Sequence, residues 1–164
     1  MHATPHRPEH GIRQAGSADA DVIARLLHDF NREFDEPTPE PPVLAARIRQ
    51  LLNDGDTTVL LADDRGGLAV HRFRAAIWSN GNECTLAELY VTRHHRGRGL
   101  GRALLEAAID AAHRRRADYL EVATGANNLA ARALYEQLGF THQHHGEITY
   151  HYQRELPEPT SSTA

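Results

Sequence analysis

The sequence predicts a domain of the mixed α/β (α+β) class, in which strands and helices are interspersed along the chain. Short runs rich in β-branched residues recur between turn residues, and longer runs carry apolar residues at three- and four-residue steps. The chain has 164 residues, 40% of them hydrophobic and 24% charged, which suits one globular domain with a buried core. We expect that single domain at residues 11–156, between flexible tails at 1–10 and 157–164.

The first part of the chain is predicted to hold a short strand and two helices. A strand at 12–15 alternates in polarity, and Ser17 is expected to cap the helix that follows it. In that helix the apolar residues of 22–30 fall on one face. The acidic, proline-rich stretch 35–42 ends the helix, and a second helix is expected at 43–52.

The rest of the chain is predicted to hold strands separated by turn residues, with two further helices. The expected strands are 57–62, 68–78, 85–91, 119–123, 140–144 and 148–154. The expected helices are 100–115 and a helix that begins after Asn128. The predicted order is therefore strand, two helices, three strands, helix, strand, helix and two strands.

The segment Arg96-Gly97-Arg98-Gly99-Leu100-Gly101-Arg102, here called the cradle loop, carries the clearest functional signal. Its glycines leave the main chain bare, so that its N–H groups can surround an anion. The positive end of the following helix points at the same place, and three arginines add charge suited to phosphate. The segment predicts a pyrophosphate site, and a basic loop without any ligand is the alternative.

Two better-known glycine-rich motifs do not fit the cradle loop. A dinucleotide fingerprint needs a third glycine where Arg102 stands, and a P-loop needs Gly-Lys followed by Ser or Thr, which is missing here. The spacing that fits is Arg-x-x-Gly-x-Gly. In this respect the chain resembles the GCN5-related N-acetyltransferase (GNAT) superfamily, whose acyl-CoA signature has that form.

A second segment strengthens the resemblance. Residues 128–140 look like the same superfamily's Asn-x-x-Ala-x-x-Leu-Tyr-Glu-x-x-Gly-Phe pattern. Asn128 is a good N-cap, and Tyr135 follows it by about two helical turns, so both side chains lie on one helical face. The resemblance implies the superfamily's fold, a mixed and mostly antiparallel sheet flanked by helices.

The resemblance implies acetyl-CoA as cosubstrate, bound where strands 85–91 and 119–123 splay apart. Main-chain groups of the first strand would pair with the pantetheine arm, the cradle loop would hold the pyrophosphate, and Asn128 would bind the pantetheine amide region. The residues expected to bind acetyl-CoA are therefore Leu89, Tyr90, Val91, Arg96, Gly97, Arg98, Gly99, Leu100, Gly101, Arg102 and Asn128.

The resemblance also implies two catalytic groups. Tyr135 would protonate the departing thiolate. Glu88, one residue from the expected oxyanion donor, is the leading candidate for the base, although it can also be read as a solvent-facing strand carboxylate. Glu83 and a water chain at Tyr90 are the other candidates. Some protein N-terminal acetyltransferases of the superfamily carry a glutamate where this chain has Ala123, which puts that form of catalysis in doubt.

The function that these features predict is acetyl transfer from acetyl-CoA to a primary amine, here expected to belong to a small molecule, by direct attack. The acidic residues of 33–40 would attract a cationic amine, although a solvated acidic loop explains the same residues without any substrate. Two alternatives stay open: a protein or peptide N-acetyltransferase, and a catalytically degenerate acyl-CoA-binding sensor. The identity of the acceptor does not follow from the sequence.

Composition excludes several other classes. A net charge of −4 and an aromatic content of 6% disfavour nucleic-acid binding. We expect no membrane span, because the apolar runs are short. The lone Cys84 is expected to be buried and apolar, and it suits a reducing cytoplasm. Despite 12 histidines we expect no metal site, since no ligand pattern accompanies them. A homodimer stays open.

Overall fold

The computed structural model describes residues 10–156 and divides into two compact units, the first ending at Val122 and the second beginning at Ala123. The tail expected at 157–164 lies outside the described residues, as does the tail at 1–10 apart from His10. The expectation of a single domain at 11–156 stays a prediction.

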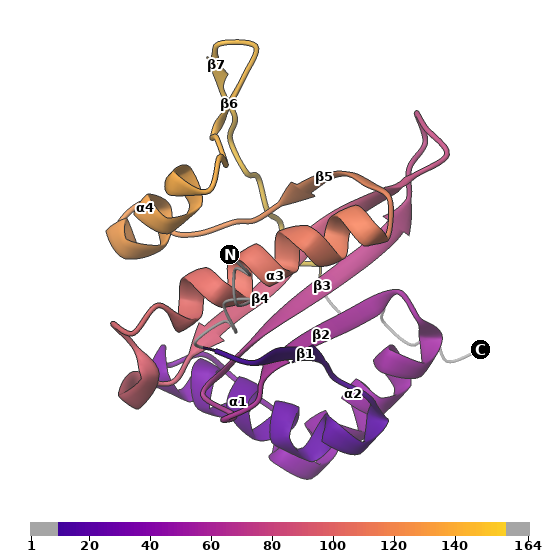
Figure 1. The fold of residues 1–164 in the computed structure, drawn as a ribbon, viewed down its shortest axis with the longest axis vertical. Coiled ribbons are helices and arrows are strands. Elements are labelled where there is room, and N and C mark those ends of the chain that lie inside the picture. The colour runs from indigo at the N-terminus through magenta and orange to yellow at the C-terminus, as the bar shows by residue number, and fades with distance from the viewer. Residues whose placement is uncertain (1–9, 157–164) are drawn as a thin grey trace, which may run out of the picture. The chain divides into compact units, whose positions relative to one another are not determined.

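The first unit is built on a five-stranded sheet whose strands follow one another in sequence order, β1-β2-β3-β4-β5 (Figure 1). Its strands are β1 (Ile12–Gln14), β2 (Thr57–Ala62), β3 (Gly67–Ala75), β4 (Asn82–Val91) and β5 (Ala117–Glu121). Neighbouring strands are antiparallel except for β4 and β5, which are parallel. The predicted fold class, a mixed and mostly antiparallel sheet with helices, is confirmed.

Helices cover both faces of this sheet (Figure 1). On one face α1 (Ala20–Glu33) and α2 (Pro41–Asp54) pack against β2, where Val59 and Leu61 join their apolar cluster. On the other face lies α3 (Leu100–Arg114), which contacts β2, β3, β4 and β5. Every residue of β2 is buried, because both of its faces are covered.

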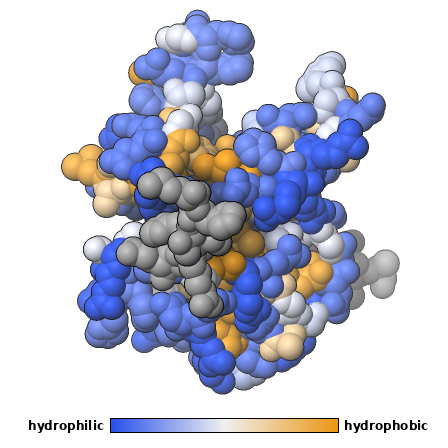
Figure 2. All heavy atoms as spheres, viewed as in Figure 1, coloured by the Kyte–Doolittle hydropathy of each residue, from blue (hydrophilic) through white to orange (hydrophobic). Residues whose placement is uncertain are grey.

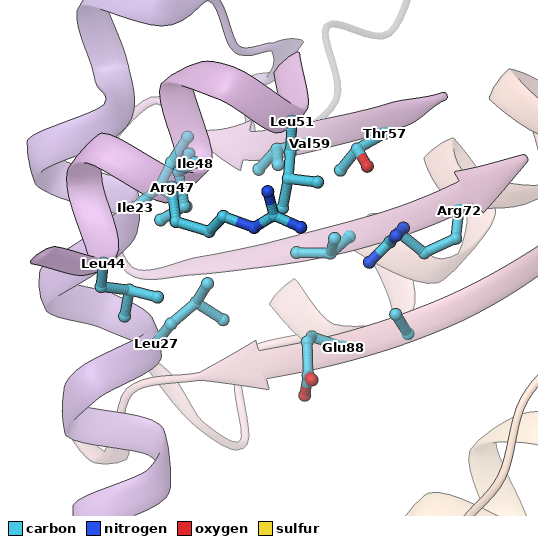
Figure 3. A pocket seen from close by; sticks show the side chains of 12 residues that line it. Ile23, Leu27, Leu44, Arg47, Ile48, Leu51, Thr57, Val59, Arg72 and Glu88 are labelled. Atoms are coloured by element: carbon cyan, nitrogen blue, oxygen red, sulfur yellow. The ribbon is translucent and has the colours of Figure 1, made fainter. Parts of the chain in front are cut away.

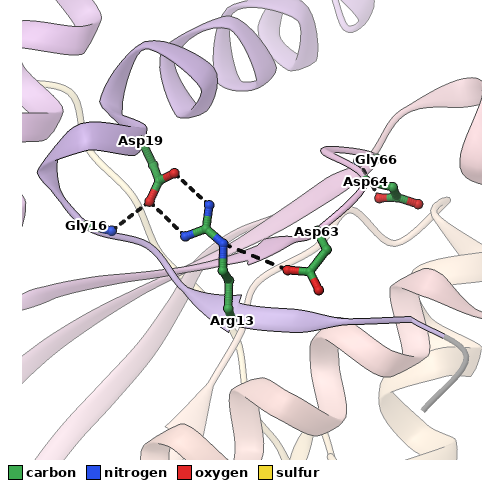
Figure 4. A network of polar contacts seen from close by, with 6 residues as sticks. All are labelled: Arg13, Gly16, Asp19, Asp63, Asp64 and Gly66. Carbon is green, nitrogen blue, oxygen red and sulfur yellow. Dashed lines mark hydrogen bonds and ion pairs between the residues drawn. The ribbon is translucent and has the colours of Figure 1, made fainter. Parts of the chain in front are cut away.

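The start of α1 differs from the prediction that Ser17 caps it. Ser17 lies in a 3-10 turn, η1 (Ser17–Asp19), and its hydroxyl donates to the side chain of Asn53 over 2.9 Å. Asp19 instead accepts the N–H of Gly16 at 2.9 Å and two hydrogen bonds from Arg13 at 2.7 and 2.9 Å (Figure 4). The Arg13 guanidinium lowers the pKa of Asp19 to about 2. The two oxygens of a carboxylate match the two N–H groups of a guanidinium, which the single oxygen of a hydroxyl does not.

The connection from β3 to β4 also departs from the predicted strand 68–78, because β3 ends at Ala75. Ile77 and Trp78 lie in the turn that follows and are 82% and 93% exposed. The face drawn in Figure 2 is mostly hydrophilic, with smaller hydrophobic areas. Cys84, in contrast, is buried as predicted, and burial raises the pKa of its thiol to about 11.

The second unit contains α4 (Leu129–Gln137), whose predicted N-cap is confirmed. The Asn128 side chain accepts the N–H of Ala131 over 3.2 Å. The predicted strands 140–144 and 148–154 are wrong in extent. Only β6 (Gln143–His144) and β7 (Glu147–Ile148) form, as a separate two-stranded sheet. Their residues are all exposed, so no buried apolar face specifies longer strands.

Candidate active site

The cradle loop connects the end of β4 to α3 through a 3-10 turn, η2 (Arg93–His95). Gly97 and Gly99 have φ angles of +72° and +82°, in the left-handed region that favours glycine. A Cβ atom added at Gly97 would meet nothing within 4 Å, so the main chain there is open to approach. The helix α3 begins at Leu100, as predicted.

The main chain of the cradle loop suits an anion. Within the part of the chain that the structure describes, the N–H groups of residues 97–101 donate to no backbone carbonyl, and the first turn of α3 holds no acidic residue. These donors and the positive end of the helix are therefore not compensated by a carboxylate. The arrangement fits a diphosphate such as that of acetyl-CoA.

The three arginines of the cradle loop differ in their contacts. Arg96 donates to Glu33 and to the Val91 carbonyl, while Arg102 pairs with Glu106 in the next helical turn. The guanidinium of Arg98 has no hydrogen-bond or ion-pair partner among the described residues. Arg98 is therefore the arginine best placed to add side-chain charge to the main-chain donors.

Beyond the cradle loop, one edge of β4 is open over half its length. The parallel pairing of β4 with β5 ends at Thr85 and Glu121, and residues 86–91 have no strand partner on that side among the described residues. Their main-chain groups can therefore accept an extended ligand as an added strand. This is the place where the sequence predicts that Leu89, Tyr90 and Val91 meet pantetheine.

The opposite edge of β4 contains a β-bulge. Val70 of β3 aligns with Glu88, and His71 aligns with Leu86, so Ala87 is an extra residue without a partner on β3. A bulge re-aims neighbouring main-chain and side-chain groups and is frequent beside active sites. No sequence motif marks it, because it depends on the register between two strands.

A cavity of about 150 Å³ opens at this bulge, between α1, α2 and the strands β2, β3 and β4 (Figure 3). Ala87 and Glu88 of the bulge contribute to its lining. Most of the other lining side chains are apolar: Ile23, Leu27, Leu44, Ile48, Leu51, Val59 and Val70. The cavity is therefore lined mainly by apolar side chains, and the carboxylate at the bulge is one of its few polar groups.

Of the three candidate bases, Glu88 is the one that lines this pocket. It is half-buried, and burial raises the pKa of its carboxyl group above the ordinary value. Glu83 forms an ion pair with Arg74. The buried Tyr90 stacks on Phe30 and donates its hydroxyl to Glu33 over 3.2 Å. Geometry thus favours Glu88 over the two alternatives.

The other predicted functional residues lie in the second unit. Tyr135 is half-buried in α4 and lies 5.7 Å from the ring of Phe140. Burial raises the pKa of its phenol, which keeps the proton on the oxygen at neutral pH. Asn128 caps α4 through its side-chain oxygen, which leaves its amide N–H groups for other contacts. The roles of both residues toward acetyl-CoA stay predictions.

The described residues lack the features of two other classes of site. Residues 10–156 contain no group of three or more histidine, cysteine, aspartate or glutamate side chains placed to hold a metal ion. Over the same range, each helix is too short or too polar to cross a lipid bilayer.

Comparisons with known proteins agree with this geometry. A model of the acetyltransferase (GNAT) family matches residues 23–140. The crystal structure of a protein from Arthrobacter sp. FB24, assigned as an acetyltransferase, superposes with a TM-score of 0.85 at 40% identity, covering 93% of this chain and all of that one.

Two curated relatives are similar over most of this chain. The uncharacterized N-acetyltransferase YhfO of Bacillus subtilis (strain 168) is 32% identical over 132 residues, which is 79% of this chain and 88% of that protein. Mycothiol acetyltransferase of Beutenbergia cavernae is 35% identical over 161 residues, which is 94% of this chain but 51% of that longer protein. With the fold, these matches show that the chain belongs to the GNAT family and is an N-acetyltransferase.

Proposed function

We propose that this enzyme transfers an acetyl group from acetyl-CoA to the primary amine of a small molecule, by direct attack. The observation that carries the proposal is the cavity of about 150 Å³ at the bulge of β4, with Glu88 in its lining. A pocket of this size suits the reacting end of a small amine. It gives less support to a folded protein as acceptor.

In this proposal, main-chain groups bind most of the cosubstrate, acetyl-CoA. The N–H groups of residues 97–101 hold the pyrophosphate at the start of α3, and Arg98 adds its charge. The open edge of β4 holds the pantetheine arm through Leu89 and Tyr90. This places the thioester near the bulge, where a main-chain N–H polarises its carbonyl and stabilises the charge that develops on the oxygen.

The transfer itself requires two proton movements. The amine nitrogen bonds to the carbonyl carbon, and Glu88 takes the proton that the amine loses. The bond between carbon and sulfur then breaks, and the thiolate takes the proton of Tyr135. An elevated pKa at Glu88 makes the carboxylate a stronger base, and the elevated pKa of Tyr135 keeps it protonated until the thiolate forms.

The proposal is tested by measuring CoA release from acetyl-CoA over a panel of small amines and short peptides, with the products identified by mass spectrometry. We expect an acetylated small amine and release of one CoA per product. Acetylation of the peptides alone would replace this proposal with a peptide acceptor. Binding of acetyl-CoA with no transfer to any acceptor would indicate an acyl-CoA sensor.

A further inference from the structure

The acceptor cavity contains two positive charges that the sequence did not associate with it. Arg47 of α2 and Arg72 of β3 both line the cavity. In Figure 3 their guanidinium groups extend over the strands toward one another. They come from elements separated in the sequence by β2, so only the fold brings them together.

Neither arginine has an acidic partner among the described residues. Arg47 donates to the neutral side chain of Gln50 over 2.8 Å, and the side chain of Arg72 has no hydrogen bond or ion pair among the described residues. Other arginines on the same two elements are paired: Arg49 binds Asp21 over 2.7 Å, and Arg74 binds Glu83. On α2 and β3, the arginines without an ion-pair partner are thus the two that line the cavity.

Glu88 does not serve as their counter-ion. Burial alone raises the pKa of its carboxyl group, whereas a close guanidinium would lower it. In Figure 3 its carboxylate points away from both arginines. Both arginines are exposed side chains without an anionic partner among the described residues, and a bound carboxylate would accept hydrogen bonds from both groups.

We propose that the acceptor is an amine that also carries a carboxylate, which Arg47 and Arg72 bind, and an apolar group that fills the cavity. This inference rests on the proposed function, because it names the class of acceptor. The volume of about 150 Å³ limits the apolar group to roughly the size of a benzene ring. Free amino acids with apolar side chains have this combination of groups.

An acceptor that carries a carboxylate differs from the cationic amine that the acidic residues of 33–40 led us to expect. A purely cationic amine would be repelled by Arg47 and Arg72, while an amino acid carries no net charge at neutral pH. Its amine can face Glu88 while its carboxylate faces the two arginines. The charges of the cavity and of such an acceptor are therefore complementary.

The test compares acceptors that differ only in the carboxylate. The kcat/KM for acetyl transfer is measured with L-leucine, L-methionine and L-phenylalanine, with the amide of each, and with the corresponding amines that lack the carboxyl group. We expect each amino acid to exceed its amide and its amine by roughly ten- to a hundredfold, the range for hydrogen bonds to a charged group.

Three variants make the comparison specific. Arg47→Gln and Arg72→Gln should each lower the ratio of kcat/KM for the amino acid to kcat/KM for the plain amine by roughly tenfold or more. Arg49→Gln is the matched control, since Arg49 is on the same helix but pairs with Asp21, and it should keep the preference. Thermal melts of all three verify that they fold.

Each outcome decides one question. Equal or better turnover of the amides and amines by the wild type would overturn the carboxylate proposal and leave the acetyltransferase function standing. A preference that survives both Arg47→Gln and Arg72→Gln would also overturn it. Failure of every amine in the wider panel would instead contradict the proposed function itself.

Discussion

Glu33, the last residue of α1, binds Arg96 of the cradle loop through an ion pair and a hydrogen bond. The Nη1–Oε1 distance is 2.7 Å and the Nη2–Oε2 distance is 2.9 Å. Arg96 also donates from Nε to the carbonyl of Val91 over 2.9 Å. The Glu33 carboxylate is 12% exposed, and the guanidinium of Arg96 holds its pKa below the ordinary value. Through these contacts, Arg96 links the cradle loop to α1 and β4.

The variant Glu33→Gln should loosen the cradle loop, because the amide keeps the shape of the side chain but loses its charge. We expect the KM for acetyl-CoA to rise several-fold. The free energy of unfolding should fall by about 1 kcal/mol, since Arg96 is partly exposed, which lowers the melting temperature by about 2–4 °C.

The matched control for this prediction is Glu36→Gln, which removes an exposed carboxylate a few residues away. It should leave both quantities unchanged. An unaltered KM for acetyl-CoA in Glu33→Gln would mean that the contact with Arg96 has no part in shaping the cradle loop.

The variant Glu88→Gln should lower kcat by about 10²–10⁴-fold, the usual contribution of a general base, with little change in acetyl-CoA affinity. Activity requires the ionised carboxylate, so it falls as the pH drops through the pKa of Glu88. Because burial raises that pKa above 4.5, the acid limb of kcat/KM should lie above pH 4.5. The limb should vanish in Glu88→Gln and persist in Glu83→Gln; the reverse result would assign the base to Glu83.

The variant Tyr135→Phe should reduce kcat far more than it weakens acetyl-CoA binding, because the phenol acts only when the thiolate departs. The ring is retained, so the packing of Tyr135 against Phe140 should survive. Tyr152→Phe, at a position that is 88% exposed, is the control and should behave as the wild type. Turnover in Tyr135→Phe equal to that of the control would reduce Tyr135 to a packing residue.

His71 should make the protein sensitive to mild acid. It is fully buried, its Nε2–H donates to the Ala108 carbonyl over 3.1 Å, and its Nδ1 has no partner. Burial lowers its pKa below the ordinary 6.5, so the folded protein keeps the ring neutral while the unfolded chain can protonate it. Stability is therefore present above about pH 6.5 and declines below it.

The measurement is the melting temperature between pH 7.5 and 5. His71→Leu should be less stable at pH 7.5 because the hydrogen bond is lost, but its melting temperature should fall less as the pH drops. His113→Leu, which changes an exposed histidine on α3, should follow the wild type. An equal acid-induced decline in His71→Leu would show that other groups cause it.

Local patterns predicted the parts of the fold that depend on neighbours in the sequence. The glycines of the cradle loop, the start of α3 at Leu100 and the cap at Asn128 follow from residue chemistry within one or two turns. The strand 57–62 was predicted with its observed bounds, because a buried apolar run has clear limits.

Features that depend on distant partners were missed. The bulge at Ala87 needs the register between β3 and β4, and the contact of Glu33 with Arg96 joins residues on separate elements. The cap at Ser17 was wrong because Ser17 lies in a 3-10 turn and donates to Asn53, while Asp19 occupies the N-cap position of α1. Arg47 and Arg72 are ordinary surface residues in the sequence, and only the packing of α2 over the sheet gives them a common cavity.

Calorimetric titration of acetyl-CoA into two variants at Gly99 tests the central claim, that main-chain groups of the cradle loop hold the pyrophosphate. Because the φ of Gly99 is +82°, Gly99→Ala and Gly99→Glu bear the same backbone strain. Only the second adds a negative charge to the anion site. We predict that Gly99→Ala binds acetyl-CoA more weakly than the wild type and that Gly99→Glu, although folded, does not bind it. Equal affinity in the two variants would contradict the claim.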